Sequence, residues 1–164
     1  MKRSERVEVL QRQFAIATSA GNPASLATRN LLFCTSWLGF DRQNRVAFLC
    51  HFDTPWSVRR IQEVERALVG LVPAGSTFET HVVSGTWLAF PYSLLTRLLI
   101  RRAAVRLHNI RCTVTVHPFL VWRLRAAVLV NAQLCRWRSF SYVWERGPII
   151  AKVPESFAKS ERSA

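Results

Sequence analysis

Residues 31–52 read LLFCTSWLGFDRQNRVAFLCHF, and this stretch decides the fold. Two apolar, aromatic-rich runs at residues 31–40 and 45–52 flank a polar loop at residues 41–44. Runs of this kind around a short polar loop are typical of a β-hairpin. With this loop Phe40 pairs with Arg45, and the same register places Cys34 directly opposite His51 on one face of the hairpin.

A cysteine opposite a histidine predicts an activated thiol. The imidazole can take the thiol proton, and the resulting ion pair holds the thiolate at neutral pH. A bulge that shifts the register by one residue would put Cys34 and His51 on opposite faces. A second interpretation therefore stays open, in which Cys34 is a small core residue and His51 a hydrogen-bonded structural histidine.

The rest of the chain alternates helical and strand-like segments. Thr54-Pro55 is typical of a helix start, and apolar residues follow it at helical spacing up to Leu68. Residues 80–87 are strand-like, and Pro91 opens a second helix over 92–107. Three β-type runs follow at 110–117, 119–130 and 134–144. We expect an α+β domain, with the Leu-rich side of helix 92–107 packed on a sheet.

Length and composition exclude several classes of protein. The chain has 164 residues, 49% hydrophobic and 20% charged, which is the balance of one globular domain and not of a disordered chain. Four cysteines are too few for a disulfide scaffold. We find no stretch apolar enough to span a membrane and no secretory signal, so we expect a cytoplasmic protein.

The net charge of +13 comes mostly from one part of the sequence. Residues 97–138 contain nine arginines and no acidic residue. The arginines are Arg97, Arg101, Arg102, Arg106, Arg111, Arg123, Arg125, Arg136 and Arg138. Such a surface attracts an acidic protein or nucleic acid, but the sequence contains none of the short recognition motifs of nucleic-acid-binding domains, which favours the protein. Ordinary solvent-facing arginines explain the same composition.

The spacing around the cysteine carries a resemblance to a known family. Thr28, Cys34 and His51 stand at −6, 0 and +17, and Pro55 follows the histidine at +4. This pattern resembles the CheD family of chemoreceptor glutamine deamidases, whose histidine opens a His-x-x-Leu-Pro motif. The resemblance spans about residues 14–150. Leu32-Phe33 precedes the cysteine here, where the family usually has Gly-Ser.

The resemblance implies a CheD-like sandwich of mixed β-sheet with two main helices and a Cys34–His51–Thr28 catalytic triad. It implies a hydrolase that converts a glutamine side chain of a protein into glutamate through a thioester, with Thr28 orienting His51. For Thr28 to reach the site, the chain must bend near residues 29–30. The family's Gly-Gly-Ala motif has its counterpart in Ser84-Gly85-Thr86, which we expect to bind substrate.

Several alternatives and boundaries complete the prediction. We assign residues 1–13 to an N-terminal segment, 14–153 to the domain and 154–164 to a tail. We expect no cofactor and no metal, since the cysteines and histidines form no tight ligand pair such as Cys-x-x-Cys. The substrate is a chemoreceptor or, in a toxin-like relative, another protein. The rival hypothesis is a non-catalytic basic module that binds an acidic protein or nucleic acid.

Overall fold

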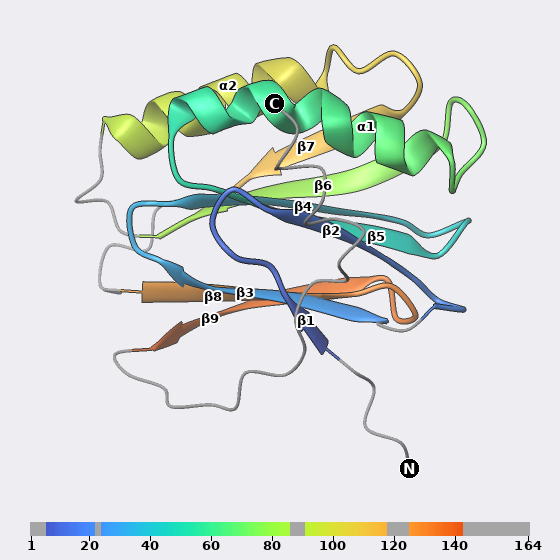
Figure 1. The fold of residues 1–164 in the computed structure, drawn as a ribbon, viewed down its shortest axis with the longest axis horizontal. Coiled ribbons are helices and arrows are strands. Elements are labelled where there is room, and N and C mark those ends of the chain that lie inside the picture. The colour runs from blue at the N-terminus through green and yellow to red at the C-terminus, as the bar shows by residue number, and fades with distance from the viewer. Residues whose placement is uncertain (1–5, 22–23, 86–90, 118–124, 143–164) are drawn as a thin grey trace, which may run out of the picture.

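The computed structural model describes residues 6–21, 24–85, 91–117 and 125–142. These residues form three layers: a four-stranded sheet, a five-stranded sheet and a layer of helices that covers the outer face of the five-stranded sheet (Figure 1). Both sheets combine parallel and antiparallel pairs. The predicted α+β class with mixed sheets and two main helices is therefore confirmed.

The five-stranded sheet has the order β2-β5-β4-β6-β7. Its strands are β2 (Phe14–Thr18), β5 (Val46–Phe52), β4 (Thr35–Asp41), β6 (Thr77–Ser84) and β7 (Arg111–Val116). The central β4 and β5 are buried at every position, which explains why their sequences are continuous apolar runs. Gly39 in β4 is needed because a Cβ there would lie 2.6 Å from the ring of Phe48.

The four-stranded sheet has the order β1-β3-β8-β9. Its strands are β1 (Arg6–Glu8), β3 (Ser25–Leu31), β8 (Arg125–Asn131) and β9 (Arg136–Tyr142). The first of these strands lies in the part of the chain that we assigned to an N-terminal segment. It pairs in parallel with β3 over three residues, so the N-terminal segment contributes to the sheet.

The first helical segment begins where the sequence predicts it. Thr54 accepts a hydrogen bond from Ser57 N, and Pro55 occupies the first turn. The segment opens as a 3-10 helix, η1 (Pro55–Arg60), and continues as α1 (Ile61–Val69). Its Val58, Ile61, Val64 and Leu68 are buried against the five-stranded sheet.

The second helix, α2 (Tyr92–Ala104), packs beside η1 and over β7, which confirms that it lies on a sheet. Its orientation differs from our expectation. The buried positions are Ser93, Thr96, Arg97, Ile100 and Ala104. Leu95, Leu98 and Val105, which we expected to face the sheet, are exposed. No helix in the described part of the chain is long and apolar enough to cross a membrane.

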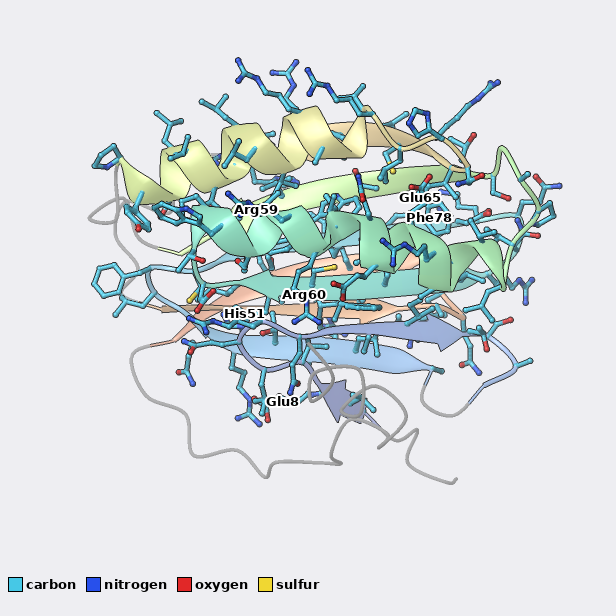
Figure 2. All side chains as sticks on the ribbon, turned by 45° about the horizontal axis from the view of Figure 1, so that its top comes forward. Glu8, His51, Arg59, Arg60, Glu65 and Phe78 are labelled. Carbon is cyan, nitrogen blue, oxygen red and sulfur yellow. The ribbon has the colours of Figure 1, made fainter. Side chains whose placement is uncertain are left out.

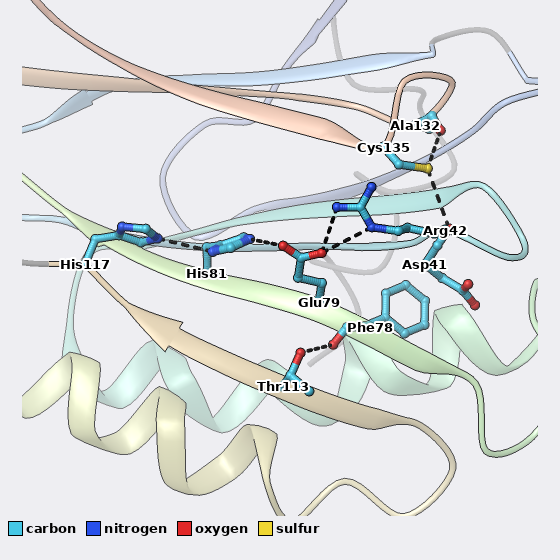
Figure 3. A network of polar contacts seen from close by, with 9 residues as sticks. All are labelled: Asp41, Arg42, Phe78, Glu79, His81, Thr113, His117, Ala132 and Cys135. Atoms are coloured by element: carbon cyan, nitrogen blue, oxygen red, sulfur yellow. Dashed lines mark hydrogen bonds and ion pairs between the residues drawn. The ribbon is translucent and has the colours of Figure 1, made fainter.

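Two apolar cores separate the layers. One lies between the two sheets and includes Leu26, Leu38 and Leu49, whereas the other lies between the five-stranded sheet and the helices and includes Trp37, Phe48 and Phe78. A polar chain crosses the inter-sheet space, where His117 contacts His81, His81 contacts Glu79, and Glu79 binds Arg42 (Figure 3). The same space contains His51.

Candidate active site

The first site residue, Thr28, is brought to the hairpin by a sharp turn. Asn30 has a left-handed backbone conformation (φ 61°), and Leu32 N donates to Asn30 O at 2.8 Å. The pairing of β3 with β8 shifts register between Thr28 and Leu31. The bend that we predicted near residues 29–30 is therefore present. It lets the chain leave one sheet after Leu31 and enter the other just after Cys34.

The hairpin has a different register from the one we predicted. Asp41 pairs with Val46 and Ser36 pairs with His51, so the predicted pairing of Cys34 with His51 is wrong. The turn occupies residues 42–45, because Arg45 is left-handed (φ 52°) and the Asp41 carboxylate accepts the backbone N–H groups of the turn. The shift of two residues is even, and it keeps Cys34 on the side of the hairpin that carries His51.

The hydrogen bonds of Thr28 define the tautomer of His51. The Thr28 hydroxyl donates to Val9 O at 2.7 Å and lies 2.7 Å from His51 Nδ1. A hydroxyl has one proton to donate, so Thr28 must accept at the second contact and His51 Nδ1 must carry the proton. Nε2 of a neutral His51 is then a proton acceptor. This nitrogen is buried and has no hydrogen-bond partner among the described residues.

The surroundings of His51 favour the neutral imidazole. The residue is 2% exposed, and burial lowers its pKa from 6.5 to about 4, although the Val9 carbonyl and the Asp53 carboxylate act in the opposite direction. At neutral pH the ring is therefore uncharged. An uncharged ring with a free Nε2 is the form that a general base requires.

Cys34 lies immediately before β4 and is 6% exposed. Burial raises the pKa of its thiol, the Asp53 carboxylate raises it further, and a hydrogen bond from the Gln11 side chain lowers it. The Gln11 amide nitrogen lies 3.7 Å from Sγ. Because burial favours the neutral forms of both Cys34 and His51, the resting pair is a thiol and an imidazole. Our sequence-based expectation of a standing ion pair is not supported by these pKa shifts.

The segment after β1 ties Gln11 to His51. Arg12 N donates to His51 O at 2.9 Å, and His51 N donates to Gln13 O at 3.0 Å, so the residues next to Gln11 are fixed to the histidine backbone. Arg12 Nε also binds Asp53 Oδ2 at 2.6 Å. Sequence reasoning missed Gln11, Arg12 and Asp53, because nothing in the triplet Gln-Arg-Gln indicates a partner some 40 residues later.

Gly85 holds the end of β6 against the cysteine loop. Gly85 N donates to Cys34 O at 3.3 Å, and a Cβ at this position would collide with the carbonyl oxygens of Leu31 and Leu32. Ser84 is buried and its hydroxyl lies 2.9 Å from that of Thr35. Thr86 lies outside the described residues. The small residue is thus needed for a close backbone approach, and the predicted substrate-binding role of Ser84-Gly85-Thr86 stays a prediction.

The other histidines and cysteines do not gather around this site. His81 Nδ1 lies 3.2 Å from His117 Nε2 (Figure 3). Trp137 packs on both rings. Cys50 is buried on the opposite, helix-facing side of β5. Within the described ranges no three His, Cys, Asp or Glu side chains are placed to hold a metal ion.

Among the described residues, the arginines of residues 97–138 do not form one surface. Arg97 is buried in α2, and burial lowers its pKa. The exposed Arg101 and Arg102 lie on α2, in the helical layer, whereas Arg136 lies on β9 in the four-stranded sheet on the far side of the molecule (Figure 1). The single arginine surface that we expected is therefore divided between two layers.

No protein-family model and no curated protein sequence matches this chain.

Proposed function

We propose that this chain is a cysteine-dependent protein glutamine deamidase related to the CheD family. The observation that carries the proposal is the order of hydrogen bonds from Val9 through Thr28 to His51. That order leaves Nε2 of His51 as a proton acceptor in the space that Cys34 also borders. The same residues stand at the CheD spacing in the sequence.

In the first half of the reaction Cys34 Sγ attacks the side-chain carbonyl carbon of a protein glutamine. His51 Nε2 takes the thiol proton as the C–S bond forms, and then gives it to the amide nitrogen as the C–N bond breaks. Ammonia leaves, and the substrate is held as a thioester. Thr28 accepts from Nδ1 throughout, so it keeps the ring in one orientation and favours the imidazolium that forms transiently.

In the second half water replaces ammonia. His51 Nε2 takes a proton from water, whose oxygen attacks the thioester carbon, and the C–S bond breaks as the proton passes to sulfur. The products are a glutamate side chain and the free Cys34 thiol. Two tetrahedral oxyanions form on this route, and each needs a hydrogen-bond donor. The Gln11 amide, which already points at Sγ, is the side-chain donor that we assign to them.

The proposal includes the compartment and the substrate class. All four cysteines are free thiols, as expected of a protein that works in the reducing cytoplasm. In addition to Cys34, Cys135 is buried in the core between the sheets and Cys50 in the core beneath the helices. The substrate is a chemoreceptor or another glutamine-bearing protein. A glutamine side chain extends far enough from a backbone to enter a site in which the nucleophile itself is only 6% exposed.

Mass spectrometry of substrate proteins tests the activity. Wild type, Cys34→Ser and the matched variant Cys112→Ser are incubated with purified chemoreceptor cytoplasmic domains and with casein. We expect Gln-to-Glu conversion with wild type and with Cys112→Ser, and none with Cys34→Ser. Conversion that survives in Cys34→Ser would refute the mechanism.

A second candidate function rests on the state of the thiol. Burial raises the pKa of Cys34, and a protonated buried thiol is what a non-catalytic protein would also contain. In that case the chain is a basic binding module for an acidic protein. Iodoacetamide distinguishes the two functions, because a catalytic Cys34 is alkylated faster than Cys50, Cys112 and Cys135, whereas in a binding module its rate does not exceed theirs.

A further inference from the structure

A groove of about 470 Å³ runs between η1 and α2 on the helical face of the molecule. Its apolar lining includes Trp56 and Val58 from η1 and Leu95 and Leu99 from α2. Trp56 is 58% exposed and Leu95 47% exposed, so large apolar side chains stand open to solvent on both walls. Exposed apolar surface gathered in one groove is typical of an interaction site.

The polar part of the lining has one sign of charge. Arg59 of η1, Arg102 of α2 and Arg106 just after α2 line the groove, and its lining contains no acidic residue. Figure 2 shows Arg59 on the side of the first helical segment that faces α2. These three guanidinium groups make no ion pair with any described residue. The groove therefore offers unpaired positive charge beside apolar surface.

The groove reaches toward the candidate nucleophile. Trp56 at its wall packs against Tyr92, with ring centroids 6.0 Å apart. The next residue, Ser93, donates to the carbonyl oxygen of Phe33, which directly precedes Cys34. The side chain of Phe33 is 58% exposed. These contacts connect the beginning of α2, beside the groove, to the loop that carries Cys34.

We propose that this groove binds an acidic segment of the substrate protein, in which apolar side chains fill the lining and carboxylates pair with Arg59, Arg102 and Arg106. The inference rests on the proposed function for the identity of the partner as a substrate. The apolar walls favour a protein over a nucleic acid, which has no aliphatic side chains to bury. The basic charge of the groove disfavours two other occupants. A second copy carries +13, and residues 139–164 carry four basic and three acidic side chains.

The test measures binding separately from catalysis. The probe is a fluorescein-labelled peptide of Leu and Glu, compared by anisotropy with a peptide in which Lys replaces every Glu and with a single-stranded oligonucleotide. All measurements use the full chain carrying Cys34→Ala. Peptide binding by this variant would support the groove proposal even if the deamidase proposal fails. Deamidation by the wild type without peptide binding would refute the groove proposal and leave the deamidase proposal intact.

Two groove variants and one matched variant define the outcome. We expect Trp56→Ala and Arg102→Glu each to weaken binding of the Leu/Glu peptide by about tenfold. Arg136→Glu makes the same change of charge on the far sheet and should leave the affinity within about twofold. The affinity should also fall as salt is added. Equal binding of the Lys peptide, preferred binding of the oligonucleotide, or indifference to both groove variants would overturn the proposal.

A photo-crosslinker identifies the occupant directly. With p-benzoylphenylalanine in place of Leu95, we expect a crosslink to the Leu/Glu peptide that Trp56→Ala abolishes. A crosslink to residues 143–164 of the same chain, or to a second copy of the protein, would show that the groove is already occupied and would overturn the proposal.

Discussion

Two buried histidines, His51 on β5 and His81 on β6, point into the same space between the sheets. His51 is 2% exposed and His81 7% exposed, and burial lowers the pKa of both. Their partners differ. Neither Nε2 makes a hydrogen bond within the described structure. His81 contacts His117 through Nδ1, and its Nε2 lies 3.4 Å from a carboxylate oxygen of Glu79, whereas His51 contacts Thr28 through Nδ1 and makes no ion pair with a described residue.

The difference separates a structural histidine from one that can transfer a proton. Both nitrogens of His81 face titratable side chains, and Trp137 packs on its ring, so the space around this ring is filled by the chain's own side chains. His51 Nε2 has neither a hydrogen bond nor an ion pair within the described structure, and Cys34, whose thiol the Gln11 amide contacts, belongs to the core between the same two sheets. Burial alone therefore does not indicate the function of a histidine, whereas the partners of its two ring nitrogens do.

The largest expected effect separates the two histidines by activity. We expect His51→Gln to lower the rate of glutamine deamidation by a factor of about 10² to 10⁴, because the general base is lost. His81→Gln should leave the rate within about threefold after correction for the folded fraction. The measurement is ammonia release from a protein substrate. Equal losses in both variants would contradict the assignment of His51.

Gln11 sharpens the comparison, because His81 has no counterpart to it. We expect Gln11→Ala to lower kcat by a factor of about 10², as for the loss of one oxyanion donor. The variant should also slow alkylation of Cys34, since the hydrogen bond from the Gln11 side-chain amide to Sγ lowers the pKa of the thiol. Gln62→Ala on the exposed side of α1 is the control. An unchanged kcat in Gln11→Ala would show that the contact of Gln11 with Cys34 is structural and that Gln11 is not an oxyanion donor.

Acid should destabilise the protein through both histidines. A pKa lowered from 6.5 to about 4 means that the unfolded chain binds a proton at His51 that the folded chain does not. Stability is therefore lost as pH falls from about 6.5 toward 4, by about 3 kcal/mol for this residue. His81 and His117 act in the same direction. Urea denaturation should show a shallower loss in His51→Gln, and an unchanged slope would contradict the buried neutral histidine.

The smallest effect concerns the orientation of the ring. Thr28→Val removes the acceptor for Nδ1–H, and we expect about a five- to tenfold loss of kcat, equal to one hydrogen bond. Nitrogen NMR shifts of His51 should change from one tautomer to a mixture. Thr28→Ser should restore both the rate and the shifts. A variant that is destabilised but keeps the single tautomer would indicate that Thr28 only fills space.

Local signals in the sequence predict much of this molecule. The hairpin follows from two apolar runs around a polar loop, and the first helical segment follows from Thr54-Pro55 and the spacing of Val58, Ile61 and Val64. These features depend on residues close together in the chain. The side of the hairpin shared by Cys34 and His51 also follows, since an even error in register does not change the face.

Features that depend on distant contacts could not be predicted. The orientation of α2 is set by the layers beneath it, so its Leu-rich stretch did not reveal that Leu95 and Leu98 are exposed. The role of Gln11 depends on backbone bonds to His51, which leave no motif in either segment. The division of the arginines between two layers likewise depends on the sheet topology, which cannot be inferred from the number of charges along the sequence.

The short edge strand β1 has a consequence for the local stability of the site. β1 forms only three ladder pairs at one edge of its sheet, yet the five residues after it supply Val9 O, the Gln11 amide and the Arg12 guanidinium. Opening of residues 6–13 would dismantle these contacts while most of both cores stayed folded. Hydrogen exchange at the Arg12 amide would then report the fraction of molecules with an intact site, independently of global unfolding.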